Sequence, residues 1–152
     1  MLKKLIQNRK SIREYKVSSI YDDFINDVLE IAKKAPSAGA ARAYKTYVVK
    51  DKDVVRISII ARQSWIKDAA TVIVLCSEPK KSEKRYGKRG KDLYCIQDTT
   101  IYGAYLDLLF VEKGYGTCWV GYFKEKELRV FLDIPEDIKP LSLLVVGKLI
   151  DD

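Results

Sequence analysis

The clearest pattern in the chain is helical and runs from residue 97 to residue 113, just before Gly114. Its apolar residues recur at intervals of three and four on several sides of the helix. They are Ile101, Ala104, Leu108 and Val111, with the pairs Tyr105–Leu109 and Leu106–Phe110. A helix that is apolar around most of its circumference needs cover on most sides. The pattern therefore predicts either a central helix shared between its own core and a partner subunit, or an ordinary buried helix that ends at a glycine cap.

Shorter patterns predict the remaining elements. Two continuous apolar runs indicate strands that are buried on both faces, and two further stretches are rich in β-branched and aromatic residues. The four predicted strands are 46–49, 71–76, 116–121 and 141–146. Glycines bracket the third of these, which indicates a close approach of another group to its backbone. Helices are also predicted over 54–61 and 124–132.

The first part of the chain contains two more predicted helices. Leu2, Leu5 and Ile6 share one face of a short helix. The second helix is expected to begin at a cap formed by Ser18 or Ser19 and to end before Pro36. Its predicted core stripe is Phe24, Val28, Ile31 and Ala35. A run of small residues, 36–43, follows and is too small to fill a core, so it either passes close to a bulky group or moves freely.

Composition favours one globular domain, since 47% of the 152 residues are hydrophobic and 32% are charged. The net charge of +7 is concentrated in residues 80–91, which contain seven basic residues and one acidic residue. Gly87 and Gly90 suggest that this basic segment is a loop. No apolar run approaches the ~20 residues of a membrane span. The start of the chain also lacks the apolar region of a secretory signal, which favours a cytoplasmic protein.

The sequence excludes several kinds of catalytic site. It contains no histidine, which rules out histidine-ligated metals, Ser-His-Asp triads and Cys-His dyads. Its three cysteines, Cys76, Cys95 and Cys118, lack the spacing of a zinc site or a disulfide framework. No metal site and no catalytic side chain are therefore predicted, and the chemistry is expected to depend on a bound organic cofactor.

Four segments of the sequence occur in an order and spacing that resemble those of the FMN-dependent nitroreductase family. The segments are Arg9-Lys10-Ser11-x-Arg13, Pro36-Ser37-Ala38, Gln97-Asp98 and Gly116-Thr117-Cys118-Trp119-Val120-Gly121. The resemblance covers nearly the whole chain. It implies an α+β fold in which a central sheet is flanked by helices, a single FMN-binding domain over 1–152, and an intertwined homodimer with flavin sites at its interface.

The resemblance also implies which residues bind the cofactor. Arg9, Lys10, Ser11 and Arg13 would hold the phosphate and ribityl end of FMN. Pro36, Ser37 and Ala38 would touch the flavin from the other subunit, and the Val120-Gly121 backbone would lie beside the nitrogen that accepts hydride. Gln63 is a candidate for the pyrimidine edge of the flavin, although an exposed glutamine at a helix end is equally expected there.

Two departures from the family pattern affect the expected affinity for FMN. Ala40 stands where relatives have an Asn, and Arg42-Ala43-Tyr44 replaces Gln-Pro-Trp, so a polar flavin contact is lost unless Arg42 substitutes for it. Many relatives continue past the last strand with a tail that embraces the partner. In this chain Lys148 is the one basic candidate in that region.

The resemblance implies a two-step reaction in which NAD(P)H reduces FMN and a small acceptor, such as a nitroarene or a quinone, then takes the electrons. A non-catalytic flavin-binding protein and an azoline-type dehydrogenase are the alternatives on the same scaffold. A nucleic-acid binder acting through residues 80–91 is disfavoured, because Tyr86 is the only aromatic residue there for base stacking.

Overall fold

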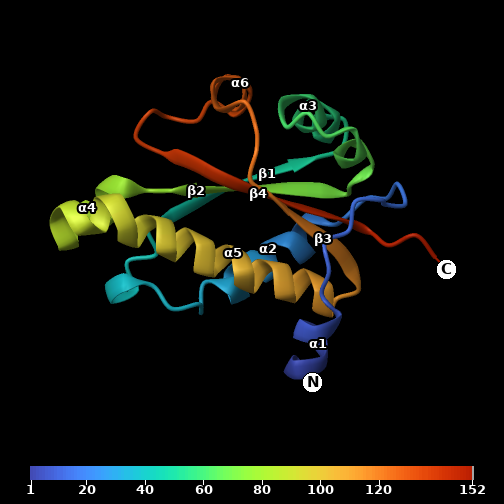
Figure 1. Ribbon diagram of the computed structural model, residues 1–152, viewed down its shortest axis with the longest axis horizontal. Coiled ribbons are helices and arrows are strands. Elements are labelled where there is room, and N and C mark those ends of the chain that lie inside the picture. Colours follow the sequence, from blue (N-terminus) through green and yellow to red (C-terminus); the bar gives the residue numbers. More distant parts are fainter. Residues whose placement is uncertain (152) are drawn as a thin grey trace.

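A four-stranded antiparallel sheet forms the centre of the computed structural model, which describes residues 1–151 (Figure 1). The strands are β1 (Tyr44–Lys50), β2 (Thr71–Ser77), β3 (Tyr115–Val120) and β4 (Lys139–Lys148), in the spatial order β1-β2-β4-β3. Every residue of β2 is buried, and so is most of β4. The two continuous apolar runs are therefore the inner strands, as predicted, and the expected α+β class is confirmed.

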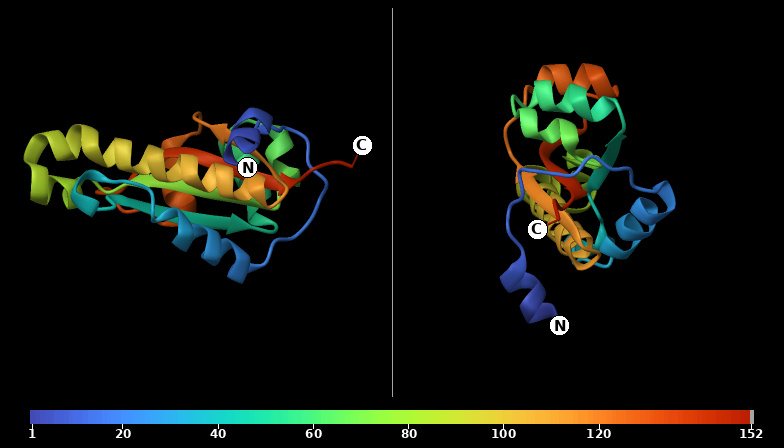
Figure 2. Two further views of the ribbon diagram at one scale, coloured as in Figure 1. Left: turned by 90° about the horizontal axis from the view of Figure 1, so that it is seen from below. Right: turned by 90° about the vertical axis from the view of Figure 1, so that its right-hand side faces the viewer.

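Helices cover both faces of this sheet (Figures 1 and 2). Helices α3 (Asp53–Ile60) and α6 (Glu125–Leu132) lie on one face, and α2 (Asp22–Ala32) and α5 (Cys95–Glu112) lie on the other. Alternate side chains of β2 enter the two cores, so that Val72 and Val74 face α3 while Ile73 and Leu75 face α5. The central strands thus hold two separate apolar layers together.

Helix α5 packs on the sheet along one side only. Its large buried side chains are Tyr102, Leu106 and Phe110. On the opposite side Ala104 is exposed, and Ile101, Leu108 and Val111 are only half-buried. The predicted helix is confirmed within one residue at its C-terminal end, and an apolar stripe remains that this chain does not cover.

The prediction of a loop over residues 80–91 is wrong. This segment forms α4 (Pro79–Arg89), which leads through one π-helical turn (Gly90–Tyr94) directly into α5. Pro79 fits the first turn of a helix, where no backbone N–H is needed. Gly90 packs closely rather than adding flexibility, because a Cβ there would lie 2.5 Å from the Ser82 carbonyl oxygen. Its conformation is helical, and only Gly87, with φ of 60°, breaks the regular geometry.

The predicted short helix at the start of the chain is confirmed, but the predicted serine cap of the second helix is wrong. Helix α1 (Leu2–Asn8) projects from the body beside the end of α5, and none of its residues is buried (Figure 2). Helix α2 begins after Tyr21 without a serine cap, because the buried Ile20 anchors an extended segment before it.

The core stripe of α2 is also shifted. It is formed by Ile25, Val28 and Ala32, with Ile31 exposed and Phe24 half-buried against Phe110 and Tyr115. Ala35 is buried as predicted, but it lies beyond the end of α2 at Ala32. None of the helices within residues 1–151 has the length and apolar content of a membrane span.

Gly147 on β4 gives a direct test of the packing. A Cβ at this position would lie 2.4 Å from the Tyr15 ring, and that ring is buried. Gly147→Ala should therefore lower the free energy of unfolding by about 1–3 kcal/mol, measured by urea denaturation. Gly121→Ala is the matched control and should be nearly neutral, because a Cβ there meets no atom within 4 Å. Equal stability of the two variants would show that Tyr15 does not pack on Gly147 as described.

Candidate functional site

The segment that contains Arg9–Arg13 lies along the outer edge of β3. Ser11 forms a parallel bridge with Thr117, and the Ile12 N–H donates to the Thr117 carbonyl at 2.8 Å. Gly116 permits this close approach, since a Cβ there would lie 3.1 Å from Ile12. The basic segment and the glycine-bracketed strand, far apart in the sequence, are therefore neighbours.

A carboxylate on α5 orients both segments. The Arg9 guanidinium lies 3.9 Å from Asp107, and the Thr117 hydroxyl donates to the other oxygen of the same carboxylate. The Asp107 side chain is only 14% exposed, so solvent screens this contact less than it would a surface ion pair. Asp107 carries no motif signal in the sequence, and its role becomes visible only when α5 and β3 are packed together.

Beside this segment lies a pocket of about 550 Å³. Its lining residues are Lys10, Ser11, Ile12, Arg13, Glu14, Leu149 and Ile150. An ammonium, a hydroxyl and a guanidinium are donors suited to a phosphate group. Burial raises the pKa of the neighbouring Cys118 thiol, although Arg13 acts in the opposite direction. The thiol is therefore neutral near pH 7 and places no competing negative charge beside the pocket.

The turn after β3 comes close to the end of α3. The Lys124 N–H donates to the Ile60 carbonyl at 3.0 Å, which brings Gly121 to the same end of the molecule as Gln63. The Gln63 side-chain oxygen accepts a hydrogen bond from Trp65 Nε1 at 2.9 Å, and the Trp65 ring packs near Tyr15. Gln63 is therefore half-buried and fixed on the side of the basic segment, with its amide NH₂ as the remaining donor.

Val120 and Lys148 are the other two site residues predicted near the ends of β3 and β4. The Val120 side chain is buried in the core, so only its backbone is available to a ligand. The Lys16 N–H donates to the Lys148 carbonyl at 2.9 Å, which places the end of β4 near the basic segment. However, the Lys148 side chain lines a neighbouring hollow with Ser18 and Lys113 rather than the pocket of Lys10 and Arg13.

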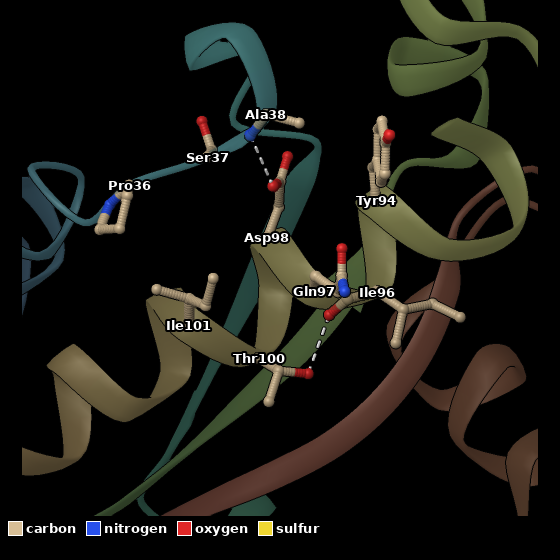
Figure 3. Close-up of a pocket in the computed structure, with 9 residues that line it drawn as sticks. All are labelled: Pro36, Ser37, Ala38, Tyr94, Ile96, Gln97, Asp98, Thr100 and Ile101. Carbon is tan, nitrogen blue, oxygen red and sulfur yellow. Dashed lines mark hydrogen bonds between the residues drawn. The ribbon is translucent and has the colours of Figure 1, made fainter. Parts of the chain in front are cut away.

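A second pocket, of about 590 Å³, lies at the beginning of α5 (Figure 3). Its lining residues are Pro36, Ser37, Ala38, Tyr94, Ile96, Gln97, Asp98, Thr100 and Ile101. The buried Asp98 carboxylate accepts the Ala38 N–H at 2.9 Å and the Ala43 N–H at 3.4 Å. Figure 3 shows this side chain reaching from α5 to the loop. Asp98 thus fixes the run of small residues, which forms an ordered loop.

This loop has an unusual backbone conformation. Gly39 and Ala40 have φ of 55° and Arg42 has φ of 49°. Positive φ is costly for residues other than glycine and persists where surrounding contacts hold it. The Ala40 N–H donates to the Ser37 carbonyl at 3.1 Å, so Ala40 lies in the same turn as Ser37 and Ala38, but it is exposed and does not line the second pocket.

The two groups of predicted site residues do not meet within one chain. The basic segment is tied to Asp107, and the small-residue loop is tied to Asp98. These carboxylates are nine residues apart on α5, which corresponds to roughly 14 Å along a helix. Each chain therefore carries two separate groups of predicted site residues at different places along the same helix.

Asp98→Asn tests how the loop is held. It should lower the free energy of unfolding by about 1.5–3 kcal/mol, because one of the two acceptor oxygens becomes an amide donor that faces a backbone N–H. Chemical denaturation measures this loss. Glu112→Gln, an exposed change of the same kind on α5, is the control and should be close to neutral. If both variants are as stable as the parent, the Asp98 carboxylate does not hold the loop as described.

Comparison with known proteins identifies the family of this chain. A model described as the nitroreductase family matches residues 6–61 and 60–148 of this chain. An Archaeoglobus fulgidus protein named for NADH dehydrogenase and NAD(P)H nitroreductase activity is 29% identical over 150 residues, which cover 95% of this chain and 83% of the relative. A Cr(VI) reductase of Pseudomonas sp. strain G-1 is 24% identical over 97% of this chain and 66% of its own length.

Solved structures share the fold. A nitroreductase family protein from Clostridium novyi NT superposes with a TM-score of 0.87 at 26% identity, covering 99% of this chain and 86% of the relative. An FMN-dependent nitroreductase from Clostridium difficile R20291 gives a TM-score of 0.82 at 23% identity, and the match covers 97% of this chain and 87% of the relative.

Proposed function

This chain belongs to the nitroreductase family of oxidoreductases, and we propose that it uses FMN to pass electrons from NAD(P)H to a small acceptor such as a nitroarene or a quinone. The observation that carries the proposal is the pocket of Lys10, Ser11 and Arg13 on the edge of β3. When bound, FMN supplies the hydride chemistry, and the protein supplies binding and orientation.

The residues present fit the phosphate end of FMN. A phosphate monoester is close to doubly charged at neutral pH. In our proposal Arg13 and Lys10 contribute the positive charge, Ser11 adds a hydroxyl donor, and Arg9 is oriented by its ion pair with Asp107. Because the segment is bonded to β3 through its backbone, its main chain is held in place before the ligand arrives.

The edge of β3 also suits contact with a flat ring. The Thr117 carbonyl faces outward to Ile12, and backbone groups two residues further along a strand face the same way. We therefore expect the Trp119 and Gly121 backbone groups to face outward as well. A side chain at Gly121 would meet no atom within 4 Å, so there is open space beside this backbone. Gln63, at the same end, has an amide donor left for the polar edge of the ring.

A homodimer would bring the two groups of predicted site residues together as half-sites of one site. We propose that the Pro36–Ala38 loop of one subunit faces the basic segment of the other, as the family resemblance implies. The half-covered stripe Ile101, Ala104 and Leu108 on α5 supports this arrangement, because apolar side chains there need a covering surface. The projecting α1, which buries none of its own residues, is a second surface that a partner subunit would cover.

Other parts of the proposal rest on different observations. The three cysteines are free and buried, which fits the reducing cytoplasm where NAD(P)H is available. All described strands belong to one sheet, which fits a single domain over 1–152. The name of the Pseudomonas relative adds chromate to the candidate acceptors.

A non-catalytic flavin-binding protein remains the second candidate for the function of this chain, because Ala40 provides no polar side chain in the loop.

Arg13→Ala should weaken FMN binding roughly tenfold or more, because a charge-assisted hydrogen bond contributes about 1.5–3 kcal/mol. Riboflavin binding should change much less, since riboflavin has no phosphate. Fluorescence titration of both flavins measures the difference, and Arg56→Ala, an exposed residue of α3 beside α6, is the control. Equal loss of FMN and riboflavin affinity would place Arg13 away from the phosphate.

Ala104→Asp tests the proposed dimer. Ala104 is exposed in one chain, so the change should be tolerated if the chain acts as a monomer. In a dimer built on α5 it buries a charge, and both dimer and fold should be lost together. Sedimentation and thermal denaturation measure these two effects, with Val55→Asp on the exposed face of α3 as the control. A stable flavin-loaded monomer of the parent protein would refute the dimer.

A further inference from the structure

Helix α4 and the π-turn after it carry more positive charge than their own acidic residues neutralise. Three of the cations are paired with carboxylates. The pairs are Lys80–Asp137, Lys88–Asp92 and Lys91–Glu83. Lys81, Arg85 and Arg89 have no carboxylate partner within residues 1–151, and each bonds an uncharged oxygen instead. Lys84 is exposed and forms no ion pair within these residues. Three of the four unpaired cations are therefore held against the small-residue loop or against Tyr94.

Two of these cations contact the loop whose residues Ser37 and Ala38 line the pocket beside Asp98. The Arg85 guanidinium donates to the Gly39 carbonyl, and Lys81 Nζ donates to the Arg42 carbonyl at 3.2 Å. Contact between α4 and the loop is so close that a Cβ on Gly39 would lie 2.1 Å from the Tyr86 hydroxyl oxygen. Helix α4 is thus packed on the strained loop as an ordered element.

Arg89 forms the rim of the pocket at Tyr94, one of its lining residues. Its Nε donates to the Tyr94 hydroxyl at 3.1 Å, and its guanidinium lies 5.5 Å from the Tyr94 ring centre. Tyr94 itself lines the pocket, beside the loop that carries Ser37 and Ala38 (Figure 3). Within the part of the chain that the structure describes, the two terminal amino groups of Arg89 have no hydrogen-bond acceptor. A guanidinium fixed at Nε with free amino groups is preorganised for a carboxylate or a similar anion.

The pocket below this rim has a different character. Pro36, Ala38, Ile96 and Ile101 give it a mainly apolar lining. An apolar floor next to a fixed cation matches a ligand that combines a flat ring with an anionic group.

We propose that Arg89, held on Tyr94, forms an anion subsite that selects electron acceptors with a carboxylate or comparable anion attached to the reducible ring. This inference rests on the proposed function, because it concerns acceptors for the same site. Ile96 and Ile101 continue into the uncovered stripe of α5, so the open side of the pocket faces the surface that the second subunit is expected to cover. An acceptor held there lies against the loop assigned to flavin contact, with its anionic group toward α4.

A matched pair of acceptors tests the subsite. We suggest 4-nitrobenzoate and 4-nitrobenzamide, which share the ring and the nitro group and differ in charge. Their binding to the FMN-loaded protein is measured by calorimetry, and their reduction by kcat/KM with NADPH. The variants are Arg89→Gln and, as control, Lys80→Gln, which removes one charge from the same helix at a residue paired with Asp137.

The parent should bind the carboxylate more tightly than the amide. Arg89→Gln should lower this preference roughly fivefold, since a charge-assisted bond at an exposed rim contributes less than a buried one. Lys80→Gln should keep the preference. For each protein, the kcat/KM for the carboxylate is divided by the kcat/KM for the amide. Comparing this ratio between a variant and the parent removes the intrinsic difference in reducibility between the two compounds. The preference should also decline between 0.1 M and 1 M salt, as screening of exposed charges requires.

The possible results separate the subsite from the proposed function. A binding preference that Arg89→Gln abolishes supports the subsite even if neither compound is reduced, in which case the proposed function fails alone. Reduction of both compounds without any preference leaves the function standing and overturns the subsite. Equal loss of both compounds in Arg89→Gln also overturns it, because Arg89 would then serve only to hold α4.

Discussion

Two buried or nearly buried carboxylates on one helix determine where the functional segments lie. Asp98 accepts two backbone N–H groups from the small-residue loop, and Asp107 contacts both Arg9 and Thr117. A buried carboxylate that loses its partners is costly, so each segment is bound to α5 by the need to satisfy its carboxylate. The spacing of two residues on a single rigid helix thereby sets the distance between the two half-sites.

Helix α5 can have this role because the sheet holds it on only one side. Tyr102, Leu106 and Phe110 bury themselves against β2 and β4, which fixes the rotation of the helix. That rotation leaves the apolar stripe around Ala104 open and directs both half-sites toward the edges of the stripe. The same helix therefore links the core, the cofactor site and the expected partner surface.

The sequence predicts most of this framework and less of the site. Continuous apolar runs identify β2 and β4, and the period of apolar residues identifies α5, because these signals reflect burial directly. Helix α4 was missed because basic residues and two glycines resemble a loop, whereas Gly90 serves close packing against Ser82. The resemblance predicts which segments would bind a flavin, but only packing shows that Asp98 and Asp107 hold them. Their oxygens meet partners distant in the sequence, and no local pattern records such contacts.

We propose that a complete site takes one half from each of two chains. Its most direct test is to mix two differently tagged variants, Arg13→Ala and Ala38→Phe, each of which impairs one half-site, and to measure FMN bound to the purified mixed dimer. If the halves come from different chains, one of the two sites in the mixed dimer contains no substitution, and about one FMN should bind per dimer while neither variant alone binds well. A mixed dimer that binds no more FMN than its parents would contradict the shared site.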